Sequence, residues 1–189
     1  MRLLKFKIIA LLLIIFSYNS CKNEINQNEY CTPTEQYNYR TFFNYIPKDI
    51  KIYFNLNNAI KASEKQNKPI LIIFTGLTCK STKEIDWQII KKSGKEEYIK
   101  NNFIISLLIV DDRTKLKNID TNNTKTKTVG NCYSNMQLNK YNSNTQPLYC
   151  IVDNKLNDLT PPIGYTNDSE IFKSFIAYGI KNSKKNNQI

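Results

Sequence analysis

One stretch limits the fold of this chain more than any other, residues 68–83, which read Lys-Pro-Ile-Leu-Ile-Ile-Phe-Thr-Gly-Leu-Thr-Cys-Lys-Ser-Thr-Lys. Its residues 70–74 form a continuous apolar run between a proline and Gly76, which is typical of a central strand covered on both faces. After Gly76 the apolar spacing becomes that of a helix. The residues that share one helical face are Ile85, Ile89 and Ile90.

This pattern places Cys79 at or just before the first turn of a helix, at the carboxyl end of a central strand. Ligand and catalytic sites of open α/β sheets collect at that place. The unpaired N–H groups and the positive end of the helix dipole both favour thiolate over thiol. Lys80 and Lys83 add positive charge nearby. Cys79 is therefore a candidate reactive thiol, and the alternative is a small buried residue at a helix start.

Four segments of the chain share a pattern with a known family. They are Lys68-Pro69 with Phe74-Thr75-Gly76 and Cys79, then Ser106 to Leu116 with its Val-Asp-Asp-Arg-Thr run, Thr145-Gln146-Pro147-Leu148-Tyr149, and Gly164-Tyr165-Thr166. Together they resemble the thioredoxin superfamily, in particular the C-terminal thioredoxin-like domain of bacterial thiol:disulfide interchange proteins. The likeness covers roughly residues 50 to 180, with the segments in the family's order. It implies an α/β, thioredoxin-like fold, a central mixed β-sheet flanked by helices.

The resemblance implies a site in which Cys79 is the nucleophile and Pro147, in a cis peptide bond, presents the substrate backbone beside it. The family's second active-site cysteine is replaced by Thr82, which can steady the Cys79 sulfur but cannot form a disulfide. The acidic residue common in the first strand is replaced by Ile73, and the aromatic residue before the cysteine by Thr78. The catalytic set is thus Cys79, Thr82 and Pro147, a degenerate version of a thiol:disulfide oxidoreductase site.

The chain has four more cysteines, at positions 21, 31, 132 and 150. The resemblance places the helix that begins near Cys132 on the face of the sheet that carries the redox helix. That makes Cys132 a candidate resolving thiol, with a free or structural cysteine as the alternative. Cys31 can pair or stay free, and the sequence leaves this open. Cys150, in an alternating strand pattern, is expected in the core.

The N-terminal residues have the features of a bacterial export signal. Residues 1–20 combine a basic start with an apolar core too short to span a bilayer. Cys21 then resembles a lipoprotein cleavage site, with ordinary cleavage or an uncleaved anchor as alternatives. Residues 21–49 are a polar tether and irregular lead-in, residues 50–184 the thioredoxin-like domain, and 185–189 a tail. We expect a membrane-anchored lipoprotein facing the periplasm in the cell envelope.

Composition excludes several classes of site. The chain has no histidine, which removes Ser-His-Asp and Cys-His catalysis and any histidine-ligated zinc site. We expect no metal and no cofactor, because no Cys-x-x-Cys knuckle and no glycine-rich phosphate loop occurs. The formal charge of +11 is spread along the chain without a nucleic-acid motif, so we expect no nucleic-acid partner.

The expected elements follow from periodicity and breakers. Helices are predicted over 52–66, from Cys79 to about Gly94, over 96–101 and over 133–141. A last helix is predicted after Asp168, which caps it, and its tail is expected to fray from Lys181. The apolar face of that last helix is predicted to comprise Ile171, Phe172, Phe175, Ile176 and Ile180. Strands are predicted over 70–75, 103–111, 147–153 and, at an edge, near 156–160. Asp111 and Asp112 are interpreted as turn and cap residues, not a metal or acid/base pair, and Trp87 as a packing residue.

Two functions follow. The first is an exported protein acting in thiol/disulfide exchange through a single active-site cysteine, with partners among exported proteins that carry disulfides or free thiols, and with a membrane attachment through its N-terminal lipid. The second is a non-redox binding module of the cell envelope built on the same fold. The replacements at Thr82 and Ile73 favour the second.

Overall fold

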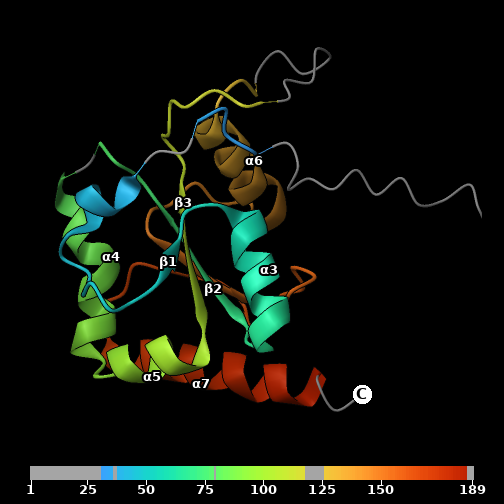
Figure 1. Cartoon of the computed structure of the whole chain (residues 1–189). Coiled ribbons are helices and arrows are strands. Elements are labelled where there is room, and N and C mark those ends of the chain that lie inside the picture. The colour runs from blue at the N-terminus through green and yellow to red at the C-terminus, as the bar shows by residue number, and fades with distance from the viewer. Residues whose placement is uncertain (1–30, 36–37, 79, 118–125, 187–189) are drawn as a thin grey trace, which may run out of the picture.

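The computed structural model describes residues 31–35, 38–78, 80–117 and 126–186, and its elements are drawn in Figure 1. In chain order they are the 3-10 helix η1 (Tyr39–Phe43), β1 (Ile52–Tyr53), α3 (Leu56–Gln66), β2 (Ile70–Thr75), α4 (Lys80–Lys92), α5 (Glu96–Asn102), β3 (Ile104–Ile109), α6 (Val129–Tyr141), β4 (Leu148–Val152), β5 (Ile163–Gly164) and α7 (Ser169–Asn186).

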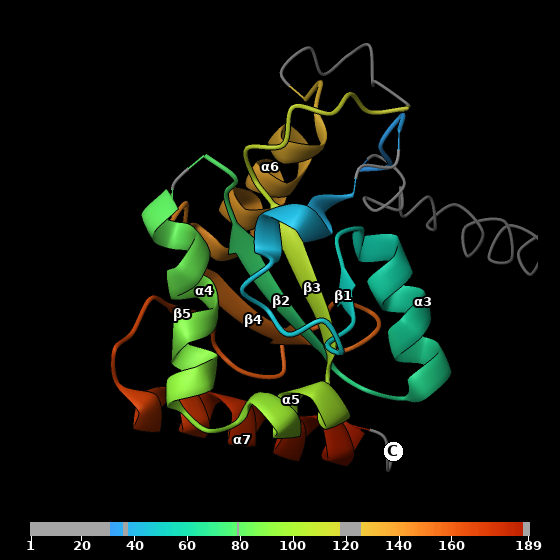
Figure 2. The same ribbon diagram turned by 60° about the vertical axis from the view of Figure 1, so that its left-hand side comes forward.

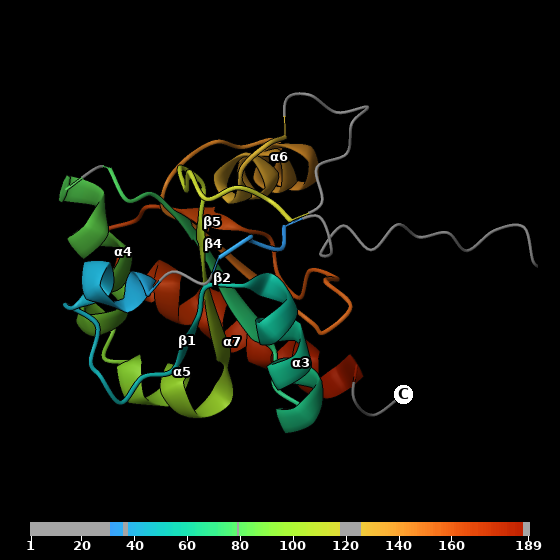
Figure 3. The same ribbon diagram turned by 45° about the horizontal axis from the view of Figure 1, so that its top comes forward.

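The strands form one mixed five-stranded sheet in the order β1-β3-β2-β4-β5. β2 lies at its centre, parallel to β3 and antiparallel to β4. All six residues of β2 are buried, as the continuous apolar run predicts, because helices cover both faces of the sheet. Figures 1 and 3 show α4 to one side of the sheet and α3 to the other.

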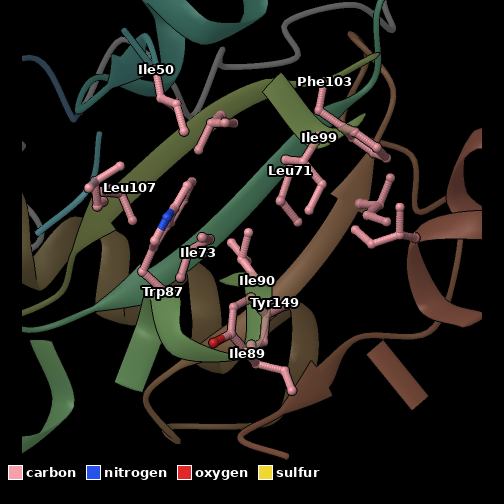
Figure 4. Packing of buried hydrophobic residues seen from close by; sticks show 14 of the residues in the cluster. Ile50, Leu71, Ile73, Trp87, Ile89, Ile90, Ile99, Phe103, Leu107 and Tyr149 are labelled. Atoms are coloured by element: carbon pink, nitrogen blue, oxygen red, sulfur yellow. The ribbon is translucent and has the colours of Figure 1, made fainter. Parts of the chain in front are cut away.

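Alternation along the strands sorts the core into two layers. One layer contains Leu71 and Ile73 of β2 with the apolar residues of η1, α4, α5 and α7, and part of it is drawn in Figure 4. The other contains Ile72 and Phe74 with residues of α3 and α6. In β4, Cys150 belongs to the second layer and is 1 % exposed, which confirms its expected place in the core.

Several element boundaries match their local signals. Gly94 lies two residues after the end of α4 and has a left-handed backbone, with φ +65, which stops the helix from continuing. The Asp168 carboxylate accepts hydrogen bonds from the N–H groups of Glu170 and Ile171, at 2.8 and 3.4 Å, and caps α7 as predicted. Trp87 is 1 % exposed and donates from Nε1 to Glu96 at 2.8 Å, so its packing role is confirmed.

Four predicted boundaries were wrong. The helix predicted over 52–66 begins at Leu56, because Asn55 caps it and residues 52–53 pair with β3 instead. Residues 156–160 do not form the predicted edge strand: an isolated bridge joins Asp158 to Val152, and the edge strand beside β4 is β5. α6 begins at Val129, four residues before the predicted start, and α7 continues through the predicted frayed tail to Asn186.

One residue of the predicted α7 face also lies elsewhere. Ile171 is 50 % exposed, whereas Phe172, Phe175, Ile176 and Ile180 are buried as expected. The lead-in before β1 is less irregular than predicted, because Tyr39 and Phe43 of η1 are buried in the first core layer. These two aromatic residues of the lead-in therefore pack onto the domain.

Candidate functional site

The loop that follows β2 is fixed by one carboxylate from the end of the neighbouring strand. Asp111 lies just beyond β3 and accepts a hydrogen bond from the Leu77 N–H at 2.7 Å. Its other oxygen accepts two more from Thr78, from the N–H at 2.9 Å and from the hydroxyl at 2.5 Å. Parallel strands β2 and β3 bring these residues to the same edge of the sheet. The chain is thus held at the two positions directly before Cys79.

These hydrogen bonds determine the charge state of the Asp111 carboxyl. Burial alone would raise its pKa, but the bonds from Thr78 and Leu77 favour the ionised form and hold the pKa below its ordinary value. Asp111 is therefore an anion at neutral pH. The sequence predicted Asp111 only as a turn or cap residue. Its three hydrogen-bond donors all belong to the loop that leads into the candidate site, so Asp111 also orders that loop.

A second loop meets the first at Gly76. The Gln146–Pro147 peptide bond is cis, as the resemblance implied, and Pro147 is buried at the start of β4. A Cβ at Gly76 would lie 3.3 Å from an oxygen of Asp111 and 3.3 Å from Oε1 of Gln146. The bare backbone of this glycine therefore runs between the two side chains. The carbonyl of Thr145 is held from behind by Gln137 Nε2, at 2.7 Å.

Cys79 lies outside the described residues, and so does the side chain of Thr82. Their neighbours are described: Thr78 is bound to Asp111, and α4 begins at Lys80. In the sequence, Cys79 comes four residues after the end of β2 at Thr75 and directly before the start of α4. Thr82 is the third residue of that helix.

A buried carboxylate on α4 was missed by the sequence analysis. Asp86 is fully buried and accepts a hydrogen bond from the hydroxyl of Thr75, the last residue of β2. The Tyr149 hydroxyl donates to the backbone carbonyl of Asp86 at 2.9 Å. Asp86 comes four residues after Thr82 in the sequence. The strand position occupied by Ile73 is apolar, but an acid is present in the same core layer, supplied by the helix.

The prediction for Cys132 was wrong in its placement. α6 packs on the face of the sheet opposite to α4, so Cys132 lies in the second core layer and not beside the start of α4. Its sulfur is bonded to Cys31, 101 residues away in the sequence, with the two Cα atoms 5.6 Å apart. In this oxidation state Cys132 offers no free thiol to resolve a mixed disulfide. The open question about Cys31 is answered by the same bond.

Cys150 is a buried free cysteine whose side chain forms a hydrogen bond with the Tyr141 hydroxyl. Burial raises the pKa of the Cys150 thiol to about 12, against a smaller opposing contribution from the Tyr141 hydroxyl. At neutral pH this thiol is protonated and enclosed. It is not a candidate nucleophile.

The described residues offer neither a metal site nor a membrane-spanning helix. Within residues 31–35, 38–78, 80–117 and 126–186, no group of three or more His, Cys, Asp or Glu side chains is placed to hold a metal ion. Over the same ranges, no helix has the length and apolar character needed to cross a bilayer. The predicted signal and Cys21 lie outside the described residues.

The mixed sheet, the helices on both of its faces and the cis Gln146–Pro147 bond match the architecture that the resemblance implied. The chain has a thioredoxin-like fold. Among solved structures it is similar to a DsbH oxidoreductase, at 14% identity and a TM-score of 0.48, over 78% of this chain and 92% of that one. It is also similar to a thioredoxin from Thermus thermophilus, at 12% identity and a TM-score of 0.44, over 71% and 90% of the two chains. No protein-family model and no curated protein matches the sequence.

Proposed function

We propose that this protein is an exported thiol/disulfide exchange protein that acts through one cysteine, Cys79, while anchored to a bacterial membrane by a lipid on Cys21. The observation that carries the proposal is the clamp of Asp111 on Leu77 and Thr78, opposite the cis Gln146–Pro147 bond. It fixes the chain immediately before a cysteine that starts a helix, where thiolate is favoured.

The reaction is an exchange of sulfur partners. The Cys79 thiolate attacks one sulfur of a substrate disulfide, a Cys79–substrate bond forms, and the other substrate sulfur leaves as a thiolate that takes up a proton. With threonine at position 82, the mixed disulfide persists until an external thiolate attacks the substrate sulfur and releases Cys79. The partners are exported proteins that carry disulfides or free thiols.

The test supplies the sulfur that the chain lacks. Thr82→Cys is expected to raise insulin reduction by dithiothreitol from near background, because Cys79 and the introduced thiol can then complete a dithiol cycle. The control adds Cys79→Ala to Thr82→Cys and is expected to return the rate to background. If Thr82→Cys gives no gain, more than the second sulfur has been lost and the proposed chemistry is wrong.

The second candidate function is a binding module without redox chemistry, favoured by the residues Thr82 and Ile73. Alkylation of Cys79 by iodoacetamide at neutral pH separates the two, with the product assigned by peptide mass spectrometry. Rapid alkylation supports thiol exchange, whereas a slow reaction supports the binding module. Cys79→Ala is likewise expected to abolish mixed-disulfide adducts recovered from cells. Adducts that persist would assign the chemistry to another cysteine.

A further inference from the structure

The disulfide between Cys31 and Cys132 fixes the point at which the N-terminal tether joins the domain. Cys132 lies in the first turns of α6, and Gly130 of the same helix start donates to the Asp112 carbonyl at 3.0 Å. Asp112 follows the Asp111 that clamps the loop before Cys79. The tether therefore joins the domain at the end of the sheet that carries the candidate site.

Backbone pairing reinforces this attachment. Thr34 donates to the Lys115 carbonyl and Lys117 donates to the Thr32 carbonyl, each at 2.9 Å. Further along, the Tyr39 hydroxyl donates to the Asp112 carboxylate. In Figures 1 and 2 the start of α6 lies at the opposite end of the molecule from α5 and α7. The disulfide therefore attaches the tether at the end of the domain opposite to α5 and α7.

The sequence limits how far Cys21 can lie from Cys31. Nine residues, 22–30, separate Cys21 from Cys31. Ten peptide steps span at most about 35 Å when fully extended. A domain of this size has a radius of gyration of about 15 Å, so the tether is no longer than the domain is wide. An uncleaved anchor that ends near residue 20 would give nearly the same length.

We propose that the Cys31–Cys132 disulfide orients the candidate site toward the membrane, and that its partners are membrane-attached proteins whose cysteines or disulfides lie close to the bilayer surface. This inference rests on the proposed function for the anchor at Cys21. The inference adds the class of partner to that function. A short tether raises the effective concentration of the site at the bilayer surface, which benefits membrane-attached partners. A freely diffusing envelope protein would gain nothing from a short tether compared with a long one.

Charge at this end of the domain is compatible with anionic headgroups. Exposed basic residues flank the attachment, and Glu35 is the exposed acid in the described segments 31–35, 112–117 and 126–128. Basic residues close to an anionic membrane surface are attracted to it. The exposed basic residues are Arg113, Lys115, Lys117 and Lys127. Because α7 also ends in exposed lysines, the tether and not the charge selects which end faces the membrane.

The test places reporter thiols at the two ends. Arg113→Cys and Lys184→Cys each remove one exposed cation, and both are made in the full lipidated chain with Cys79→Ser. Vesicles of phosphatidylcholine and phosphatidylglycerol carry a pyridyldithio-phosphatidylethanolamine, and labelling is normalised to a soluble pyridyl disulfide. We expect headgroup labelling of Arg113→Cys to exceed that of Lys184→Cys by at least about threefold. Equal labelling, or preference for Lys184→Cys, would overturn the inference.

Two further variants examine the cause. Twelve Gly and Ser residues inserted after Glu24 leave the disulfide intact and lengthen the tether. The ratio of headgroup labelling between Arg113→Cys and Lys184→Cys is then expected to fall toward one. Cys31→Ser with Cys132→Ser is expected to reduce it as well. A preference unchanged by the insertion would show that the tether does not orient the domain. Vesicle flotation separates the two proposals: a chain that does not float lacks the anchor of the proposed function, whereas a floating chain without preference contradicts only the orientation.

Discussion

Asp111 and Thr78 are joined by two hydrogen bonds, from the Thr78 N–H at 2.9 Å and from its hydroxyl at 2.5 Å, both to the same carboxylate oxygen. Thr78 is exposed, so this pair orders the surface loop that enters Cys79 without adding to the core. The pairing depends on the parallel register of β2 with β3, which brings residues 33 positions apart to one edge of the sheet.

The first prediction is that Asp111→Asn lowers the free energy of unfolding by about 1 kcal/mol at pH 7, because charge-assisted bonds to a half-buried carboxylate become neutral ones. The pKa of this carboxyl is lowered in the folded protein, so its contribution is complete above the unfolded pKa of about 4. It is lost as the pH falls through the lower folded pKa. Urea unfolding of the two proteins should therefore converge below about pH 4.

Thr78 provides the matched control for this prediction. Thr78→Ser keeps the hydroxyl and is expected to unfold like the parent, whereas Thr78→Val removes the donor and is expected to lose part of the same stability. The difference in the free energy of unfolding between the parent and Asp111→Asn should shrink at low pH. A difference as large at pH 3 as at pH 7 would contradict the assignment to the ionised carboxylate.

The second prediction concerns the disulfide that attaches the lead-in. The bond between Cys31 and Cys132 closes a loop of 101 residues in sequence separation, which strongly restricts the unfolded chain. Cys31→Ser with Cys132→Ser is expected to lower the free energy of unfolding by about 2–4 kcal/mol. Reduction of the parent by dithiothreitol should give the same urea midpoint as the double variant. An unchanged midpoint in both would show that the bond does not stabilise the domain.

The third prediction concerns the buried carboxylate of Asp86. Thr75 is fully buried and its hydroxyl donates to that carboxylate. Thr75→Val keeps the shape but removes the donor, and should cost about 1–3 kcal/mol of the free energy of unfolding. Thr75→Ser keeps the donor and loses a methyl group, so it should cost less. If the valine variant proved as stable as the serine variant in urea, the hydrogen bond would not matter.

The central strands could be predicted from the sequence because their signals are local and redundant. In β2 the unbroken apolar run has no polar interruption that a surface element would need, and in β4 alternation separates Cys150 from Tyr149 correctly. The short strands could not be predicted in the same way. Ile52 of β1 fits the helical spacing that continues into α3, and the polar side chain of Asn55, which caps that helix, decides the boundary.

The candidate site was predictable only in part, because its parts come from separate segments. Cys79 and Pro147 stand in recognisable motifs. The hydrogen-bond partners of Asp111 depend on the register between β2 and β3, which the sequence does not reveal. Asp86 has no signal beyond a carboxylate among the apolar residues of α4. Cysteine spacing does not determine pairing, so the bond of Cys132 to Cys31 required the structure. The edge strand was misplaced because Leu156 takes a left-handed backbone, with φ +63, in the turn after β4.

The last prediction concerns Cys150, whose pKa is raised to about 12 by burial. The folded thiol keeps its proton more firmly than the unfolded one, whose pKa is about 8.5. The stability that this provides is complete below the unfolded pKa and declines as the pH rises toward the folded pKa. Between pH 8 and pH 10 the parent should therefore lose about 1–2 kcal/mol more of the free energy of unfolding than Cys150→Ala does.

Urea unfolding at pH 8, 9 and 10 measures this difference, and alkylation provides an independent check. Iodoacetamide at pH 8 should leave Cys150 unlabelled in the folded protein and label it fully in urea, as read from its peptide by mass spectrometry. Prompt labelling of the folded protein would mean that the thiol is accessible and ionises normally. In that case a label on Cys150 would also have to be excluded before any adduct is assigned to Cys79.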